Sequence, residues 1–290
     1  MIAQTNLSGF CSNPKNLHFP PQSSPSFIRS PQIVSFKSIS NPTIPINVSS
    51  KRLLQCSSIS QSSDVFPSDV DESAGGLRRK KLAVFVSGGG SNFRSIYEAT
   101  VNGLVHGDVV VLVTNKPGCG GAEYARDKGI PVILFPKPKE SISEDDLVDT
   151  LRRYEIDFII LAGYLKLIPT ELIRAYPRSI LNIHPSLLPA FGGKGFYGMK
   201  VHNAVIKSGA RFSGPTVHYV DEHYDTGRIL AQSVVPVLAD DTADKLAARV
   251  LHKEHEMYVD VVAAICEERV IWRADGVPII RSKNNPDEYC

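Results

Sequence analysis

The first 63 residues contain no acidic side chain. Asp64 is the first acid in a chain of 290 residues, whereas Ser and Pro are abundant before it and Lys or Arg occur sparsely. This composition, without a continuous apolar core, is typical of transit peptides and excludes a secretory signal. We therefore predict a transit-peptide-like leader over 1–63, cut near Cys56. Because Ser and Pro outweigh Arg, the plastid is the first choice and the mitochondrion the second; a disordered tail without an address is the alternative.

Paired cysteines and long apolar runs are also missing. The five cysteines are odd in number, scattered and never in a C-x-x-C pair, which indicates reduced thiols and argues against a zinc knuckle. No run of about 18 apolar residues occurs, so no membrane-spanning helix and no membrane partner are expected. The formal net charge is only +2, and no basic stripe is interleaved with aromatics. A small molecule, not a nucleic acid, is the expected partner.

After an acidic linker over 64–79, apolar runs alternate with helix-like segments. The runs that predict strands are 81–87, 109–114, 131–135, 157–163, 180–184, 216–220 and 229–237. The segments that predict helices are 92–101, 122–128, 143–154, 170–176 and 242–268. Fully apolar strands are expected when a parallel sheet is covered on both faces. We predict one domain over 80–290, an α/β fold with a doubly wound, mostly parallel, Rossmann-like sheet.

A glycine-rich segment follows the first predicted strand. Residues 87–92 read SGGGSN, and their glycines would let backbone N–H groups approach an anion at the start of a helix that Ser91 or Asn92 can cap. The segment is neither a Walker loop nor a dinucleotide-binding fingerprint, because the spacing differs. A turn that needs glycine only for its backbone conformation is an equal alternative.

A second polar motif ends the fifth predicted strand. In the sequence NIHPSLLP, Asn182 and His184 alternate, so they lie on one face of the strand, and two prolines end the strand and stiffen the loop. A lone histidine at a strand end is usually structural. An Asn-x-His pair at the carboxyl edge of a parallel sheet, where ligands bind, instead predicts a reaction centre.

NIHPSLLP resembles the signature of the folate-dependent formyltransferases, and the segment DEHYDTG at 221–227 resembles the aspartate loop of the same family. The resemblance extends from Lys81 to about Ala274. The family includes enzymes that formylate glycinamide ribonucleotide, enzymes that formylate methionyl-tRNA, and a deformylase. The SGGGSN loop favours the first, in which such a loop holds the ribonucleotide phosphate. The tRNA-specific members would need a further carboxy-terminal domain, and the chain stops at Cys290 without one.

The resemblance implies transfer of a formyl group from the co-substrate 10-formyltetrahydrofolate to the amine of glycinamide ribonucleotide, in purine synthesis. Asn182 would donate to the oxyanion, and a protonated His184 would supply a second donor and a proton. Asp225 would keep that histidine charged. The neighbouring acids Asp221 and Glu222 are possible misassignments for Asp225. The alternatives are a 10-formyltetrahydrofolate deformylase with the same three residues, and a non-catalytic nucleotide-binding module.

The resemblance also implies the binding residues. Gly89, Gly90, Ser91, Asn92 and Glu254 would hold the ribonucleotide, and Leu165, Lys166, Leu167, Ile168, Asn182 and Asp221 would hold the folate. For Glu254 the alternative is an ordinary surface glutamate, and for the LKLI segment it is helix packing. Lys137, Lys139 and Lys166 are candidates for the folate tail.

Three further features complete the expectations. The loop at 190–199, AFGGKGFYGM, is richer in glycine than is usual in the family and is expected to move over the substrate, with Lys194 offsetting ligand charge. His202, Thr216 and His218 are expected to support the pocket or core. No metal is expected, although His252, Glu254 and His255 lie close in sequence. The sequence does not predict the oligomeric state.

Overall fold

The computed structural model describes residues 77–136, 143–285 and 287–289. The predicted leader over 1–63 and all but the last three residues of the linker over 64–79 lie outside the described residues. Lys137 and Lys139, two candidates for the folate tail, lie outside them as well.

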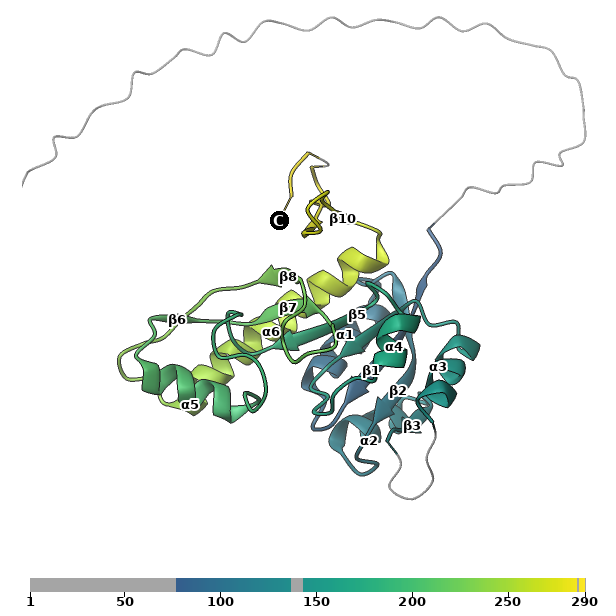
Figure 1. Cartoon of the computed structure of the whole chain (residues 1–290), viewed down its shortest axis with the longest axis horizontal. Coiled ribbons are helices and arrows are strands. Elements are labelled where there is room, and N and C mark those ends of the chain that lie inside the picture. Colours follow the sequence, from purple (N-terminus) through teal and green to yellow (C-terminus); the bar gives the residue numbers. More distant parts are fainter. Residues whose placement is uncertain (1–76, 137–142, 286, 290) are drawn as a thin grey trace, which may run out of the picture. The chain divides into compact units, whose positions relative to one another are not determined.

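A seven-stranded sheet forms the centre of the domain, in the order β3-β2-β1-β4-β5-β7-β8 (Figure 1). The first five strands are parallel, and β7 and β8 each run antiparallel to the preceding neighbour. The mostly parallel α/β sheet predicted from the sequence is confirmed. The strands are β1 Lys80–Val86, β2 Gly107–Thr114, β3 Val132–Leu134, β4 Phe158–Leu161, β5 Ile180–His184, β7 Thr216–Tyr219 and β8 Ile229–Gln232.

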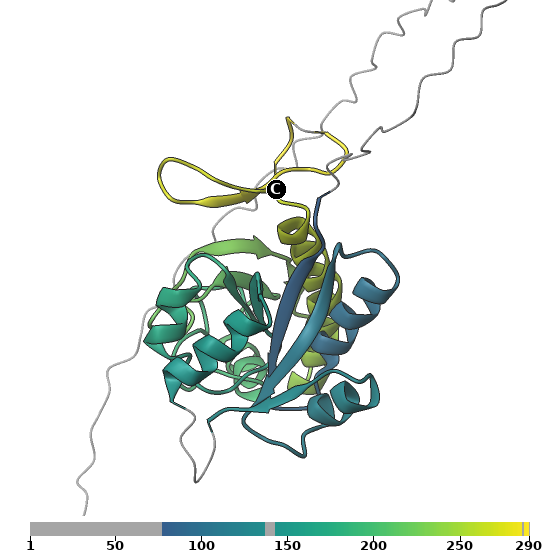
Figure 2. The same ribbon diagram turned by 90° about the vertical axis from the view of Figure 1, so that its right-hand side faces the viewer.

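Helices cover both faces of this sheet (Figure 2). Helices α1 (Ser91–Val101), α2 (Gly120–Asp127) and α6 (Ala243–Cys266) pack on one face, and α3 (Glu144–Arg153) and α4 (Thr170–Ala175) pack on the other. Strand β1 shows why its sequence is uniformly apolar. Leu82, Val84 and Val86 face the first helical layer, while Ala83 and Phe85 face the second.

The chain beyond β5 departs from the predicted elements. The run at 229–237 divides into β8 and β9 (Val235–Pro236), and β9 pairs with β6 (Phe212–Ser213) instead of extending the main sheet. Helix α5 (Met199–Ser208) and α6 pack together beside this small sheet. A hairpin of β10 (Val270–Trp272) and β11 (Pro278–Ile280), which the sequence did not predict, follows α6 and lies against β8.

The start of α1 also differs from the prediction. Neither Ser91 nor Asn92 caps it, because Gly90 occupies the capping position with φ 73° and no side-chain hydrogen bond. By contrast, Ser143 and Thr242 cap α3 and α6 through their side chains. The side chain of Asn92 is thereby free to take part in the pocket described below.

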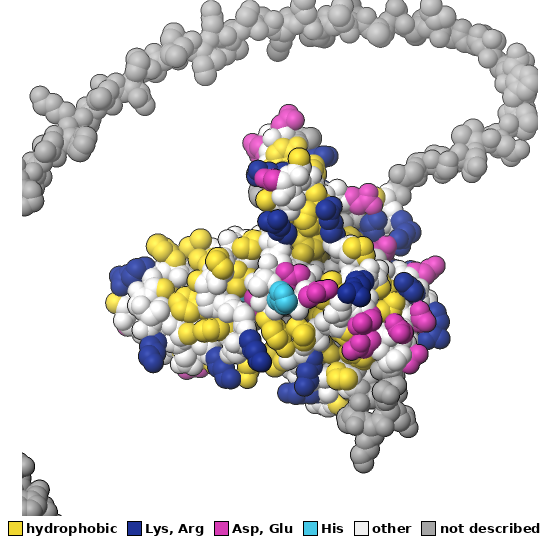
Figure 3. Space-filling view, viewed as in Figure 1, with side chains coloured by type: hydrophobic (Ala, Val, Ile, Leu, Met, Phe, Trp, Pro, Cys, Tyr) yellow, Lys and Arg dark blue, Asp and Glu magenta, His cyan; other side chains and the backbone are white. Residues whose placement is uncertain are grey.

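On the face shown in Figure 3, Lys and Arg side chains are interspersed with Asp and Glu side chains around α3 and α4. This mixture agrees with a net charge of +2 and with a small-molecule partner. In the part of the chain that the structure describes, no helix has the length and apolarity that crossing a membrane requires.

Gly90 makes the closest backbone approach in the glycine-rich segment. A Cβ atom built on Gly90 would lie 2.8 Å from the Cα atom of Gly121 in the first turn of α2, and the N–H of Gly121 donates to the carbonyl of Gly88 at 3.0 Å. The segment therefore needs glycine both for its left-handed backbone and for the contact with α2.

We predict that Gly90→Ala lowers the free energy of unfolding by about 1–2 kcal/mol for the left-handed backbone and by a further 1–3 kcal/mol for the collision with Gly121. Gly129→Ala is the matched control, since Gly129 has the same φ of 73° and open space around it. Denaturant titrations of both variants measure the difference. Equal losses in the two variants would refute the packing argument.

Candidate active site

One pocket of about 810 Å³ lies at the carboxyl ends of β1, β4 and β5. The segments after these strands, the loop before α5, the β7–β8 loop and one side of α6 line it. The residues that the resemblance assigned to catalysis and to the binding of the two substrates line this pocket: Gly89, Gly90, Ser91, Asn92, Leu165, Lys166, Leu167, Ile168, Asn182, His184, Asp221, Asp225 and Glu254.

His184 is buried at the end of β5, with only 4% of its surface exposed. Its Nε2 donates to the carbonyl of Phe191 at 2.9 Å, and its Nδ1 lies 3.4 Å from Oδ2 of Asp225. Burial lowers the pKa of His184 below its ordinary value, and the charge of Asp225 and the Phe191 carbonyl offset this effect only in part. Asp225 therefore acts on the pKa of His184 in the predicted direction, but the effect of burial is larger and the net shift is downward.

Asp225 is held by groups from three segments. Its Oδ2 accepts a hydrogen bond from the N–H of Gly193 at 2.8 Å, and its Oδ1 lies 3.6 Å from Nε2 of His218. Burial raises the pKa of Asp225, but the neighbouring imidazoles of His218 and His184 and the N–H of Gly193 outweigh that effect and leave the pKa below the usual range. The side chain is therefore a carboxylate at neutral pH.

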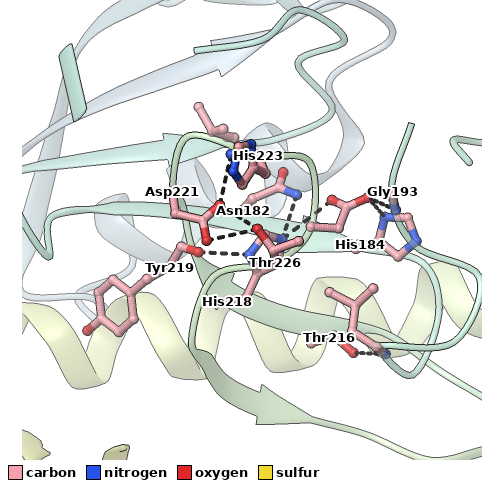
Figure 4. Close-up of polar contacts among 12 residues, drawn as sticks. Asn182, His184, Gly193, Thr216, His218, Tyr219, Asp221, His223 and Thr226 are labelled. Carbon is pink, nitrogen blue, oxygen red and sulfur yellow. Dashed lines mark hydrogen bonds and ion pairs between the residues drawn. The ribbon is translucent and has the colours of Figure 1, made fainter. Parts of the chain in front are cut away.

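His218 is a member of this cluster that the sequence placed only in a general supporting role (Figure 4). Its Nδ1 donates to the carbonyl of Tyr219 at 2.8 Å, so its Nε2 faces the pocket, 3.1 Å from Nδ2 of Asn182. The β5–β7 register explains the contact, because Asn182 pairs with His218 across the two strands. The shared face of Thr216 and His218 was visible in the sequence, but the pairing of β7 with β5 was not.

The β7–β8 loop distinguishes Asp225 from the acids near it. The hydroxyl of Thr226 donates to the carboxylate of Asp221 and lies 2.7 and 2.8 Å from its two oxygens, and the N–H of His223 donates to Oδ1 at 3.0 Å (Figure 4). These bonds close the loop on itself. Among the acids at 221–227, Asp225 is the one that contacts His184.

Glu254 projects from α6 towards the glycine-rich segment. Its Oε2 accepts a hydrogen bond from Nδ2 of Asn92 at 2.7 Å, and its side chain is 91% buried, so the surface alternative is wrong. Burial raises the pKa of Glu254, while the hydrogen bond from Asn92 lowers it in part. Oδ1 of Asn92 is buried and has no hydrogen-bond partner among the described residues. Two polar groups at this end of the pocket are therefore incompletely paired.

The LKLI segment lies in the loop between β4 and α4, and its last residue, Ile168, packs in the core with Leu172 of α4. Leu165 and Leu167 are 52% and 48% exposed, whereas Ile168 is buried. The N–H of Leu165 donates to the hydroxyl of Ser87 at 2.9 Å, which ties this loop to the end of β1. An apolar wall therefore stands across the pocket from the polar cluster.

The glycine-rich loop before α5 is attached to the cluster through its backbone. The carbonyl of Phe191 and the N–H of Gly193 are the groups bonded to His184 and Asp225. A Cβ atom on Gly192 would lie 2.4 Å from Leu188 and 3.4 Å from the Cβ of Asp225. Apart from Lys194, no residue of this segment was predicted to contribute to the site, because backbone partners leave no side-chain signature. Lys194 lines the pocket as well.

Comparison with known proteins identifies the family to which the chain belongs. A model of the formyl transferase family, Formyl_trans_N, matches residues 80–262. The chain belongs to the formyl transferase family. It is 74% identical over 216 residues to the chloroplastic phosphoribosylglycinamide formyltransferase of Vigna unguiculata, covering 73% of this chain and 69% of the relative.

More distant formyl transferases show the same likeness. The phosphoribosylglycinamide formyltransferase of Bacillus subtilis is 39% identical over 186 residues, covering 63% of this chain and 93% of the relative. The crystal structure of glycinamide ribonucleotide transformylase 1 from Geobacillus kaustophilus matches with a TM-score of 0.60 and 40% identity, over 65% of this chain and 99% of that one.

Within the described part of this formyl transferase, no group of three or more His, Cys, Asp or Glu side chains is arranged to hold a metal ion. His252 instead pairs with Glu256 on the exposed side of α6, at 3.0 Å, while Glu254 turns towards Asn92. The three neighbouring residues His252, Glu254 and His255 therefore do not form one cluster.

The buried carboxyl of Glu254 gives a prediction for stability. An acid whose pKa rises on folding binds more protons in the folded state, so stability falls as pH rises above the ordinary value of about 4.3. We expect Glu254→Gln to raise the unfolding temperature at pH 8 and to change it less at pH 5, as measured by calorimetry. Glu256→Gln, on the exposed side of the helix, is the control. A shift that is the same at both pH values would contradict the assignment.

Proposed function

We propose that this formyl transferase is a phosphoribosylglycinamide formyltransferase of purine biosynthesis. It transfers the formyl group of 10-formyltetrahydrofolate to the amine of glycinamide ribonucleotide. The observation that carries the proposal is that one pocket joins a glycine-rich, helix-capping segment to a cluster of Asn182, Asp225 and the buried His184. The names of the relatives from Vigna unguiculata and Bacillus subtilis agree with it.

The ribonucleotide occupies the end of the pocket formed by β1, α1 and α6. Backbone N–H groups of Gly89, Gly90 and Ser91 meet the phosphate at the amino terminus of α1, where the helix dipole favours an anion. Asn92 and Glu254 then face the ribose. The acceptor left unpaired on Asn92 and the incompletely paired carboxyl of Glu254 suit hydroxyl groups, which both donate and accept.

The folate occupies the side formed by the β4–α4 loop. Leu165, Leu167 and Ile168 supply an apolar wall for its flat ring, and the backbone of this loop offers polar groups at the ring edge. Lys166 provides positive charge for the glutamate tail. Asp221 lines the same pocket from the β7–β8 loop, and Asn182 lies between the two substrates.

The chemistry passes through a tetrahedral intermediate. The amine nitrogen bonds to the formyl carbon, the carbonyl oxygen becomes an oxyanion, and the side-chain N–H of Asn182 donates to it. His184 takes the proton that the attacking amine loses and passes it to the folate nitrogen as the bond between that nitrogen and the formyl carbon breaks. Asp225 stabilises the imidazolium that exists between these two steps.

The leader indicates the compartment in which the enzyme acts. Curated relatives from three plants are named chloroplastic, and residues 1–63 of this chain have the composition of a transit peptide. The enzyme accordingly acts in the plastid, and the domain over 80–290 carries the activity. The linker over 64–79 connects the two.

Loss of the formyl group from 10-formyltetrahydrofolate, measured with and without glycinamide ribonucleotide, tests the function. We expect transfer that depends on the ribonucleotide and yields its formylated product. Asn182→Ala and His184→Ala should each lower kcat by about 10² to 10⁴-fold while the circular dichroism spectrum is unchanged. Release of formate without the ribonucleotide would show a deformylase. No loss of the formyl group under either condition would favour the alternative of a non-catalytic nucleotide-binding module.

The pairing of Asp225 with His184 gives a separate prediction. Because the carboxylate raises the pKa of His184 against the effect of burial, Asp225→Asn should lower that pKa further and slow transfer. An NMR titration of the His184 ring measures the shift, and Asp221→Asn, in the same loop but bonded to Thr226, serves as the control. An unchanged titration in Asp225→Asn would refute the electrostatic role, whatever the rate.

A further inference from the structure

Tyr258 is a completely buried residue of α6 that lies beneath the pocket without lining it. Its hydroxyl is 3.1 Å from the carbonyl oxygen of Leu161 and 3.1 Å from that of Leu181. A phenol has one proton to donate, so the two carbonyls share it. The hydroxyl therefore joins the end of β4 to β5, at the residue before Asn182, from the α6 side of the sheet.

Both carbonyls belong to residues at the edge of the site. Leu181 immediately precedes Asn182, and Leu161 is the β4 partner of Asn182 in the strand register. Leu161 is also the last residue of β4 before the chain turns towards the LKLI segment. A displacement of either carbonyl would therefore move the oxyanion donor or the loop that holds the folate.

The same helical face carries a second contact. Glu254 lies four residues before Tyr258, and residues at this spacing lie one above the other on a helix. Glu254 accepts the hydrogen bond from Asn92 at the start of α1, at 2.7 Å. One stripe of α6 thus contacts the start of α1 and the strands β4 and β5. Burial raises the pKa of the Tyr258 phenol well above its ordinary value, so the hydroxyl remains a donor throughout the pH range of an enzyme assay.

We propose that Tyr258 is a positioning residue, which fixes the groups that hold the ribonucleotide relative to the groups that transfer the formyl group. The inference rests on the proposed function. Glu254 binds one substrate and Asn182 serves the reacting carbon, and the Tyr258 hydroxyl is the direct side-chain link between their elements. Because a misplacement of about 1 Å can slow a reaction of two bound substrates about 10²-fold, such a link affects the rate even though it contacts neither substrate.

Tyr258→Phe tests the proposal, since it removes the hydroxyl and keeps the ring that packs in the core. We expect the single-turnover rate at saturating concentrations of both substrates to fall at least tenfold, and the affinity for glycinamide ribonucleotide, measured by calorimetry, to weaken severalfold. Unfolding temperatures are measured in parallel. All rates are compared at a temperature at which circular dichroism shows the proteins to be fully folded.

Tyr176→Phe is the matched control. Its hydroxyl is also buried but has no hydrogen-bond partner among the described residues, and it lies in the core on the opposite face of the sheet. That variant should keep the wild-type rate and affinity. If Tyr258→Phe is less stable yet transfers the formyl group within twofold of the wild-type rate and binds the ribonucleotide equally well, Tyr258 is only structural and the inference fails. Wild-type protein without ribonucleotide-dependent transfer would instead overturn the proposed function.

Discussion

The backbone of three residues, Phe191 to Gly193, holds both members of the buried His184–Asp225 pair. A carbonyl of this segment accepts from the imidazole, and an N–H two residues later donates to the carboxylate. Neither side chain could be held in its orientation by the sheet alone, since β5 ends at His184 and Asp225 belongs to a loop. The reaction centre therefore depends on a loop whose own side chains contribute little to it.

This dependence explains the conformation of the loop. Phe191 and Asp225 both have positive φ, at 54° and 58°, a region that side chains other than glycine rarely occupy. Gly192 follows Phe191 directly, and a Cβ atom on it would collide with the side chain of Leu188. The cost of these conformations is offset by the hydrogen bonds that the two charged or polar side chains would otherwise lack in a buried site.

The sequence predicts those elements whose structure is determined by local signals within a single segment. Strand β5 has the predicted limits, and the glycine-rich segment and the LKLI segment follow strands as expected, because apolar periodicity and strand ends are local signals. It does not predict how Asp225 reaches His184. Strand β7 ends beside Leu181, near the amino end of β5 and away from His184. The β7–β8 loop therefore has to fold back over the sheet to bring Asp225 to His184. The lowered pKa of His184 was also missed, because burial depends on the whole fold.

The bond between Asn92 and Glu254 joins residues 162 positions apart, and the hydroxyl of Tyr258 reaches strands that were completed about a hundred residues earlier. Such contacts form only after a large loss of chain entropy, and they form last when a protein is made or enters a compartment from its amino terminus. Helix α6 supplies one side of the pocket and much of the core on its face of the sheet. A partly synthesised or partly imported chain without α6 therefore has no complete ribonucleotide site, so binding of this substrate reports that the last helix has docked.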